Sequence, residues 1–174
     1  VGTARSGGKI YIAGGYDSKT YFSDIYEFNP DNNRFTKIGD LPEPRSYGVL
    51  AADGSSLFYF GGWNGEEVQG NVVRFNTVSG KSEIIESGTG PLQFQTGIQR
   101  GNTLYIYGGE NARLDYSDRF FRIDLENLET VDAGRLPLGI IRSPAAYRDG
   151  TVYIAGGWSK GPVQKVISVD PEAE

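Results

Sequence analysis

Short apolar runs, each closed by a pair of glycines, recur four times along the chain. The runs are Ile10–Ala13, Leu57–Phe60, Leu104–Tyr107 and Val152–Ala155, and the pairs are Gly14-Gly15, Gly61-Gly62, Gly108-Gly109 and Gly156-Gly157. Successive pairs lie 47, 47 and 48 residues apart. A fixed period of this length indicates one supersecondary unit that is copied along the chain.

The second copy shows the predicted unit most clearly. Its apolar and polar pattern predicts four strands, at 47–52, 57–60, 71–75 and near 82–85. Asp53-Gly54, between the first two strands, is a residue pair typical of a tight hairpin turn. The turn after the third strand starts in every copy with a short polar residue, which can hydrogen-bond the backbone of a turn. These residues are Asn29, Asn76, Asp124 and Asp170.

The second strand of each unit is apolar on both faces, whereas a half-exposed strand would alternate between apolar and polar residues. Such a strand must lie between two layers. Small antiparallel sheets that pack face to face around an axis meet this demand, and they form a β-propeller. A β-sandwich is the alternative; it explains the short strands but not the four matching copies.

The pattern resembles the kelch repeat, in which a glycine pair follows an apolar second strand and an aromatic-rich third strand comes next. The first copies carry the fuller kelch-like order: Gly14-Gly15, Asp24, Tyr26, Phe28-Asn29-Pro30, Leu41-Pro42 and Pro44-Arg45. Kelch repeats usually have a tryptophan on the fourth strand, where this chain has Phe35, Ser82 and Thr130. The third copy reads Pro91-Leu92-Gln93 and lacks the Pro-Arg pair.

The resemblance implies an all-β, kelch-like β-propeller with about four four-stranded antiparallel blades over residues 1–174. The expected blades are 1–40, 45–88, 93–135 and 142–174, the last without its fourth strand. An open arc of blades leaves unpaired strand edges and a bare apolar face. We therefore expect the chain to be part of a larger ring, with the remaining blades supplied by the same polypeptide or by a second chain.

Composition excludes several classes of function. The net charge of −5 argues against nucleic acid as a partner, and no apolar run approaches the ~20 residues that membrane insertion needs. Cysteine, histidine and methionine are absent, so we expect no metal site, no cofactor and no Cys- or Ser-His-Asp-based catalytic site. The sequence leaves the compartment open; the lack of an Asn-x-Ser/Thr sequon leans away from a secreted glycoprotein and toward the cytoplasm.

Function in a propeller is expected on its loops, because the strands are used in packing. One loop set starts directly after the glycine pairs, with Tyr16, Trp63, Glu110 and Trp158. Large amphipathic side chains of this kind are enriched at protein interfaces. The alternative is that each aromatic residue folds back onto its own loop.

The second loop set joins a fourth strand to the next first strand. It holds Arg45-Ser46 and Arg142-Ser143, with Gln93 and Gln95 in the third copy. The resemblance implies that an Arg-Ser pair here presents a cation and a hydroxyl group to a peptide ligand. The alternative is an ion pair between the arginine and an acid of the adjoining loop, such as Asp40 or Glu43.

Together these features favour a protein-interaction module whose loops on one propeller face bind a partner protein or peptide. The alternative is a carbohydrate-active propeller, either a lectin-like binder with Trp63 or Trp158 stacked on a sugar or a mutarotase that uses carboxylates and arginine. The copper-dependent oxidase type lacks its histidine and cysteine here. The sequence identifies no catalytic residue, and it leans against an enzyme.

Overall fold

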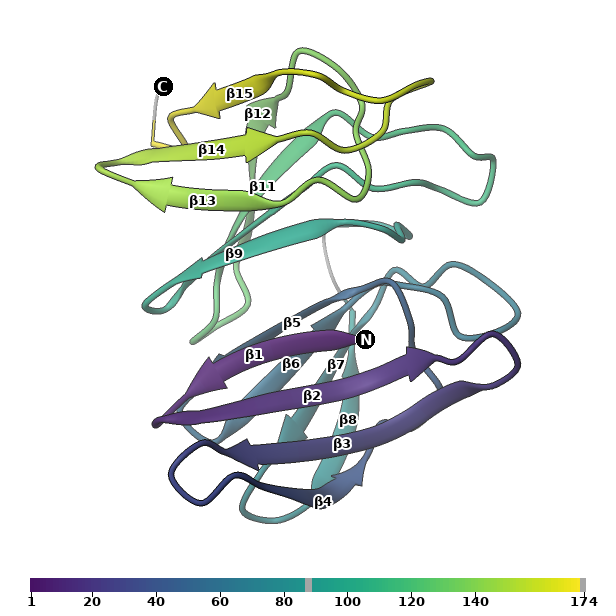
Figure 1. Cartoon of the computed structure of the whole chain (residues 1–174), viewed down its shortest axis with the longest axis vertical. Helices are drawn as coiled ribbons and strands as arrows, with labels where there is room; N and C mark the ends of the chain where they lie inside the picture. Colours follow the sequence, from purple (N-terminus) through teal and green to yellow (C-terminus); the bar gives the residue numbers. More distant parts are fainter. Residues whose placement is uncertain (87–88, 173–174) are drawn as a thin grey trace. The chain divides into compact units, whose positions relative to one another are not determined.

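The computed structural model describes residues 1–86 and 89–172, and within these ranges the protein is all-β, without a helix (Figure 1). The strands are β1 (Gly2–Ser6), β2 (Lys9–Tyr16), β3 (Tyr21–Asn29), β4 (Arg34–Asp40), β5 (Val49–Asp53), β6 (Ser56–Phe60), β7 (Val72–Asn76), β8 (Lys81–Ile85), β9 (Thr96–Arg100), β10 (Thr103–Tyr107), β11 (Arg119–Asp124), β12 (Thr130–Arg135), β13 (Ala145–Arg148), β14 (Thr151–Ala155) and β15 (Val166–Val169). The ends expected for the second and fourth blades, at 88 and 174, lie outside the described residues. None of the described residues belongs to a helix that could cross a membrane.

Each sheet is an antiparallel meander whose strands follow one another in chain order. Three sheets have four strands, β1–β4, β5–β8 and β9–β12, and the sheet β13–β15 has three strands among the described residues. Tight turns of the predicted kind connect the third and fourth strands. In one of them the Asn76 side-chain oxygen accepts hydrogen bonds from the backbone N–H groups of Val78 and Ser79, at 3.0 and 2.8 Å. This arrangement of strands is the predicted kelch-like blade.

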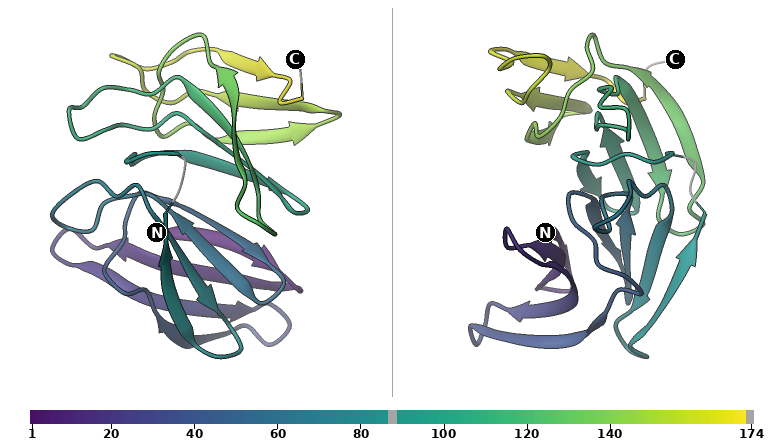
Figure 2. Two further views of the ribbon diagram at one scale, coloured as in Figure 1. Left: turned by 180° about the vertical axis from the view of Figure 1, so that it is seen from behind. Right: turned by 90° about the vertical axis from the view of Figure 1, so that its right-hand side faces the viewer.

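The strands form two compact units, Val1–Gln93 and Phe94–Glu174. In unit 1 the sheets β1–β4 and β5–β8 lie face to face (Figure 2). The buried core between them consists of Tyr11, Ala13, Ile25, Leu41, Leu50, Ala52, Leu57, Tyr59, Val73 and Phe75. In unit 2 the sheets β9–β12 and β13–β15 share the buried core Tyr105, Tyr107, Phe120, Leu136, Ile140, Val152, Ile154 and Ile167. Face-to-face packing of small sheets is the packing that the sequence predicts.

The second strands differ in how fully they are buried. All residues of β6 are buried, as are four of the five in β10, which confirms the expectation of strands buried on both faces. For β14 that expectation is wrong, because Val152 and Ile154 are buried but Tyr153, between them, is 42% exposed. The apolar side chains of β14 that point away from the unit 2 core lie at the surface, so one face of this sheet remains uncovered by the described residues.

The glycine pairs have a backbone conformation and a packing role that other residues do not fit. Both glycines of every pair have positive φ, which L-residues with a side chain rarely adopt. A Cβ at Gly14 would lie 2.1 Å from the Arg45 carbonyl oxygen, and a Cβ at Gly108 would lie 2.2 Å from that of Ile140. At each of these pairs, the loop that leads to the next sheet packs against the end of the second strand of the sheet before it.

Candidate functional site

Hydrogen bonds from the second glycine of three of the four pairs set the register of the loops that join one sheet to the next. The N–H groups of Gly15, Gly62 and Gly109 donate to the carbonyl oxygens of Arg45, Leu92 and Ile140, at 2.7, 2.9 and 2.9 Å respectively. Two residues further on, Tyr47, Phe94 and Arg142 share a positive φ of 54–61°. Arg45 is thus equivalent to Ile140, and Arg142 to Tyr47. The sequence aligns the two Arg-Ser pairs with each other. Measured from the carbonyl group that accepts the glycine N–H, however, Arg142 lies two residues further along its loop than Arg45 does.

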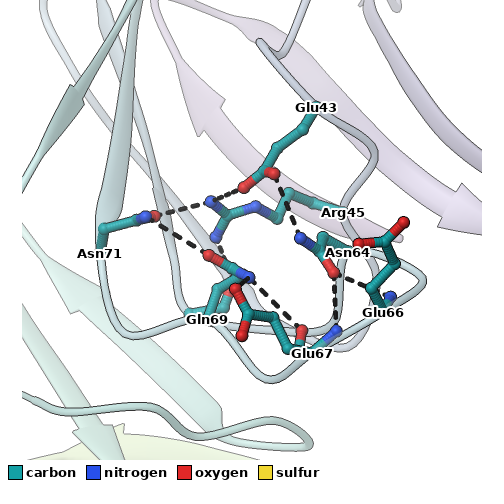
Figure 3. A network of polar contacts seen from close by, with 8 residues as sticks. Glu43, Arg45, Asn64, Glu66, Glu67, Gln69 and Asn71 are labelled. Carbon is teal, nitrogen blue, oxygen red and sulfur yellow. Dashed lines mark hydrogen bonds and ion pairs between the residues drawn. The ribbon is translucent and has the colours of Figure 1, made fainter.

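The Arg45 side chain lies inside unit 1 and is 0% exposed. Its guanidinium donates to the Gly61 carbonyl at 3.0 Å, to Glu43 Oε1 at 2.6 Å and to Asn71 Oδ1 at 2.6 Å (Figure 3). Burial lowers the pKa of Arg45, and the charge of Glu43 acts in the opposite direction. The alternative from the sequence, an ion pair with the adjoining loop, is the arrangement found here.

This polar network continues into the loop that follows the second glycine pair (Figure 3). Asn64 donates to Glu43 Oε2 at 3.1 Å, and its own side-chain oxygen accepts the backbone N–H groups of Glu66 and Glu67, each at 2.9 Å. Asn71 donates to Gln69 Oε1 at 3.4 Å. Arg45 therefore connects the two loop sets of unit 1 from within.

Three further predicted residues are also wholly or partly covered. Ser46 is 0% exposed, and its backbone exchanges two hydrogen bonds with Trp63, at 2.9 and 2.7 Å. Ser143 is 2% exposed, and its carbonyl oxygen accepts the Tyr107 hydroxyl at 2.8 Å. Gln93 is half-buried. The hydroxyl groups of both serines lack a hydrogen-bond partner among the described residues.

Aromatic side chains gather in unit 1 around the start of the first loop. Tyr16, 41% exposed, stacks on Tyr21 with ring centroids 4.3 Å apart and meets Tyr47 edge-on at 6.5 Å. The Trp63 indole N–H donates to the Tyr21 hydroxyl, and burial raises the pKa of Tyr21. Tyr16 thus folds onto its own hairpin, the alternative considered from the sequence. Tyr21 and Tyr47 are not among the candidate site residues predicted from the sequence. The position of Tyr47, directly after Arg45-Ser46, is the sequence feature that could have indicated it.

In unit 2 the structure brings three of the predicted residues together. A hollow of about 520 Å³ is lined by Glu110, Tyr116, Ile141, Arg142, Gly157 and Trp158. Isolated β-bridges hold its walls: Glu110 pairs with Tyr116, and Ile141 pairs with Trp158 through backbone hydrogen bonds of 3.1 and 3.0 Å. The residues of the two loop sets, Glu110 and Trp158 from one and Arg142 from the other, thus contribute to one site.

The hollow offers both charges and an aromatic surface. Trp158 is 45% exposed. The Arg142 guanidinium lies 4.1 Å from the centroid of the Phe94 ring, a cation–π contact. Glu110 is 8% exposed, and among residues 1–86 and 89–172 neither its carboxylate nor the Arg142 guanidinium forms an ion pair. The hollow therefore has a carboxylate and a guanidinium that are both available to a charged ligand.

A smaller hollow of about 350 Å³ on unit 2 has its charges already paired. It is lined by Thr103, Arg122, Asp124, Glu129, Val131 and Glu172. Arg122 donates to Glu172 at 2.5 Å, so its cation is satisfied within the chain. No three acidic side chains gather closely enough to hold a metal ion in the described part of the chain. The hollow around Trp158 is the better candidate site.

Comparison with known proteins shows which proteins this chain is similar to. The model of the Kelch motif matches residues 1–42. A Kelch domain-containing protein of Sulfurisphaera tokodaii is 28% identical over 108 residues, which cover 60% of this chain and 15% of that protein. A Kelch domain-containing protein of Pyrococcus furiosus is 43% identical over 54 residues, covering 30% of this chain and 17% of that protein. The chain thus spans less than a fifth of the length of either relative.

A solved structure, that of YjhT, has the same fold. It superposes with a TM-score of 0.75 at 17% identity, over 89% of this chain and 58% of YjhT. At this identity the likeness concerns the fold alone. The glycine pairs have a left-handed backbone and form hydrogen bonds to the next loop. These two features give a physical reason why a chain with this sequence motif adopts this fold. The Kelch motif over residues 1–42 and this likeness in fold together support a kelch-repeat β-propeller.

Proposed function

We propose that this chain is a protein-interaction module that binds a partner polypeptide at the hollow around Trp158. The observation that carries the proposal is the convergence of Glu110, Arg142 and Trp158 on one hollow. Arginine and tryptophan are enriched among the residues that dominate binding energy at interfaces, and both are exposed here. Arg45 has no direct part in the proposed contact, because its side chain is buried.

The family supports the same general role, since interaction with other proteins is usual for kelch propellers. The carbohydrate-active alternative is not favoured, because both relatives are named only for their kelch domains. The aromatic group of unit 1 is used mainly in contacts among its own members, as the stacking of Tyr16 on Tyr21 illustrates. We therefore assign the contact to unit 2.

Selection of binders from a random peptide library, followed by affinity measurement, tests this function. A peptide that binds the wild-type protein is expected to bind the Trp158→Ala variant at least about tenfold more weakly, because truncating a central interface aromatic typically removes 2 kcal/mol or more. The matched control is Tyr16→Ala, since Tyr16 stands at the equivalent place after a glycine pair and is 41% exposed against 45% for Trp158, but it lies outside the hollow. Equal losses in both variants, or no selected peptide, would overturn the proposal.

We also propose that further propeller blades cover the outer faces of two sheets. On the β1–β4 sheet, Tyr26 and Phe35 are 37% and 60% exposed, and the tilted rings of Phe28 and Phe35 have their centroids 4.5 Å apart. On the β13–β15 sheet, Tyr153 and Val166 are 42% and 63% exposed. Contiguous apolar surface of this kind typically marks an interaction site, and a blade from the same polypeptide or from a second chain has the matching sheet face.

Sedimentation of the isolated chain tests the covering of these faces. We expect a species heavier than the 19.0 kDa monomer, because the exposed apolar faces associate in water. Combining Phe35→Lys with Val166→Lys should shift the protein toward the monomer. Val78→Lys is the control, since Val78 is 85% exposed in a turn and belongs to neither of the two sheets. A wild-type chain that sediments as a stable monomer and binds no apolar dye would contradict the proposal.

A further inference from the structure

We infer that the hollow around Trp158 receives a basic side chain of the partner, with the Glu110 carboxylate as its acceptor. The inference rests on the proposed function and adds the chemistry of the ligand. The residue at the Glu110 position differs between copies of the repeat: Tyr16, Trp63 and Trp158 stand at the equivalent places. An acid at one of four otherwise aromatic positions gives this hollow a specificity of its own.

Glu110 is held in place, but its carboxylate has no partner among residues 1–86 and 89–172. Its backbone pairs with Tyr116 in an isolated β-bridge, directly after the Gly108-Gly109 pair. The residue is more than nine-tenths buried and lines the hollow. In the described part of the chain its carboxylate oxygens take part in none of the side-chain hydrogen bonds or ion pairs around the hollow. A carboxylate in this state can accept charge-assisted hydrogen bonds from an ammonium or guanidinium group without breaking an existing contact.

The other walls favour a cation in the same place. Trp158 and Tyr116 provide aromatic rings, whose faces attract cations. The positive charge of Arg142 is partly engaged, since its guanidinium lies over the Phe94 ring. Arg142 adds a second requirement, because its own positive charge weakens, without abolishing, the binding of a lone cation. A peptide in which a basic residue has an acidic neighbour satisfies both Glu110 and Arg142, whereas a purely acidic peptide leaves Glu110 unpaired.

Titration with single amino-acid derivatives tests the inference without a known partner. The probes are Nα-acetyl-arginine amide, Nα-acetyl-lysine amide and Nα-acetyl-glutamate amide, and the readout is the NMR signal of the Trp158 indole N–H. Saturable shifts are expected with the two cations and not with the glutamate derivative. The Glu110→Gln variant keeps the shape of the side chain and removes its charge, so cation binding should weaken about tenfold or more.

Glu126→Gln is the matched control, because Glu126 is an exposed acid that does not line the hollow; its cation binding should equal that of the wild type. Unchanged cation binding by Glu110→Gln, or preferential binding of the glutamate derivative, overturns the inference. Peptides selected on the wild-type protein give a second reading. If the binding of these peptides depends on Trp158 but not on Glu110, and the peptides lack basic residues, the inference fails while the proposed function stands. If the cations bind as expected but no peptide binds, the proposed function fails instead.

Discussion

The Gly108→Ala variant is expected to lose about 4 kcal/mol of its free energy of unfolding. Gly108 has φ +66°, and a left-handed backbone costs an alanine roughly 1–2 kcal/mol. The added Cβ would also lie 2.2 Å from the Ile140 carbonyl oxygen. That oxygen accepts the Gly109 N–H, so moving it also weakens the contact between loop and strand.

Gly101→Ala separates the two causes. Gly101 has φ +55°, but no atom lies within 4 Å of the place its Cβ would take. Only the backbone term applies, and the expected loss is about 1 kcal/mol. Urea unfolding of both variants gives the comparison. Equal losses would show that the carbonyl contact contributes nothing, and the structural role assigned to the glycine pairs would then be wrong.

The second large effect is expected at Arg45. Arg45→Ala should destabilise the protein by about 3 kcal/mol, because removal of the buried partner of a partly buried ion pair leaves the groups it binds without compensation. Glu43 loses its cation, and the Gly61 carbonyl and the Asn71 side chain lose their donor. Arg45→Lys should recover only part of the loss, since an ammonium group does not reproduce the planar set of donors.

Arg142→Ala is the matched control for Arg45, since the sequence places both arginines before a serine. Arg142 is exposed and has no ion pair with a described residue, so the expected change in unfolding free energy is within about 0.5 kcal/mol. Thermal or urea unfolding of the two variants measures the contrast. A loss at Arg142 as large as that at Arg45 would contradict the register derived from the glycine bonds.

Much of the fold could be predicted from the sequence, because its signals are local. The glycine pairs, the apolar second strands and the polar residue that opens each turn recur at a fixed spacing, and each has a backbone requirement of its own. The turn at Asn76 illustrates this: a side chain that bonds the backbone two and three residues ahead needs no information from elsewhere in the fold.

The candidate site could be predicted only in part, because its geometry depends on contacts between repeats. The two Arg-Ser pairs look alike in sequence, yet the carbonyl groups that meet the glycines belong to Arg45 and Ile140. Matching on residue type alone aligns Arg45 with Arg142. Counting back from the glycine pair that follows each loop aligns Arg45 with Leu92 and Ile140 instead, and gives the register seen in the structure. The exposure of Tyr153 was also out of reach, because the sequence of a strand does not say whether another sheet covers it.

The most direct test of the account is the location of a bound peptide. A peptide selected on the wild-type protein, titrated into the isotope-labelled chain, should shift the backbone NMR signals of the hollow more than any others. Those residues are Glu110, Tyr116, Ile141, Arg142, Gly157 and Trp158. Shifts concentrated instead on the aromatic group around Tyr16, or on the outer faces of β3 and β14, would contradict the assignment of partner binding to this hollow.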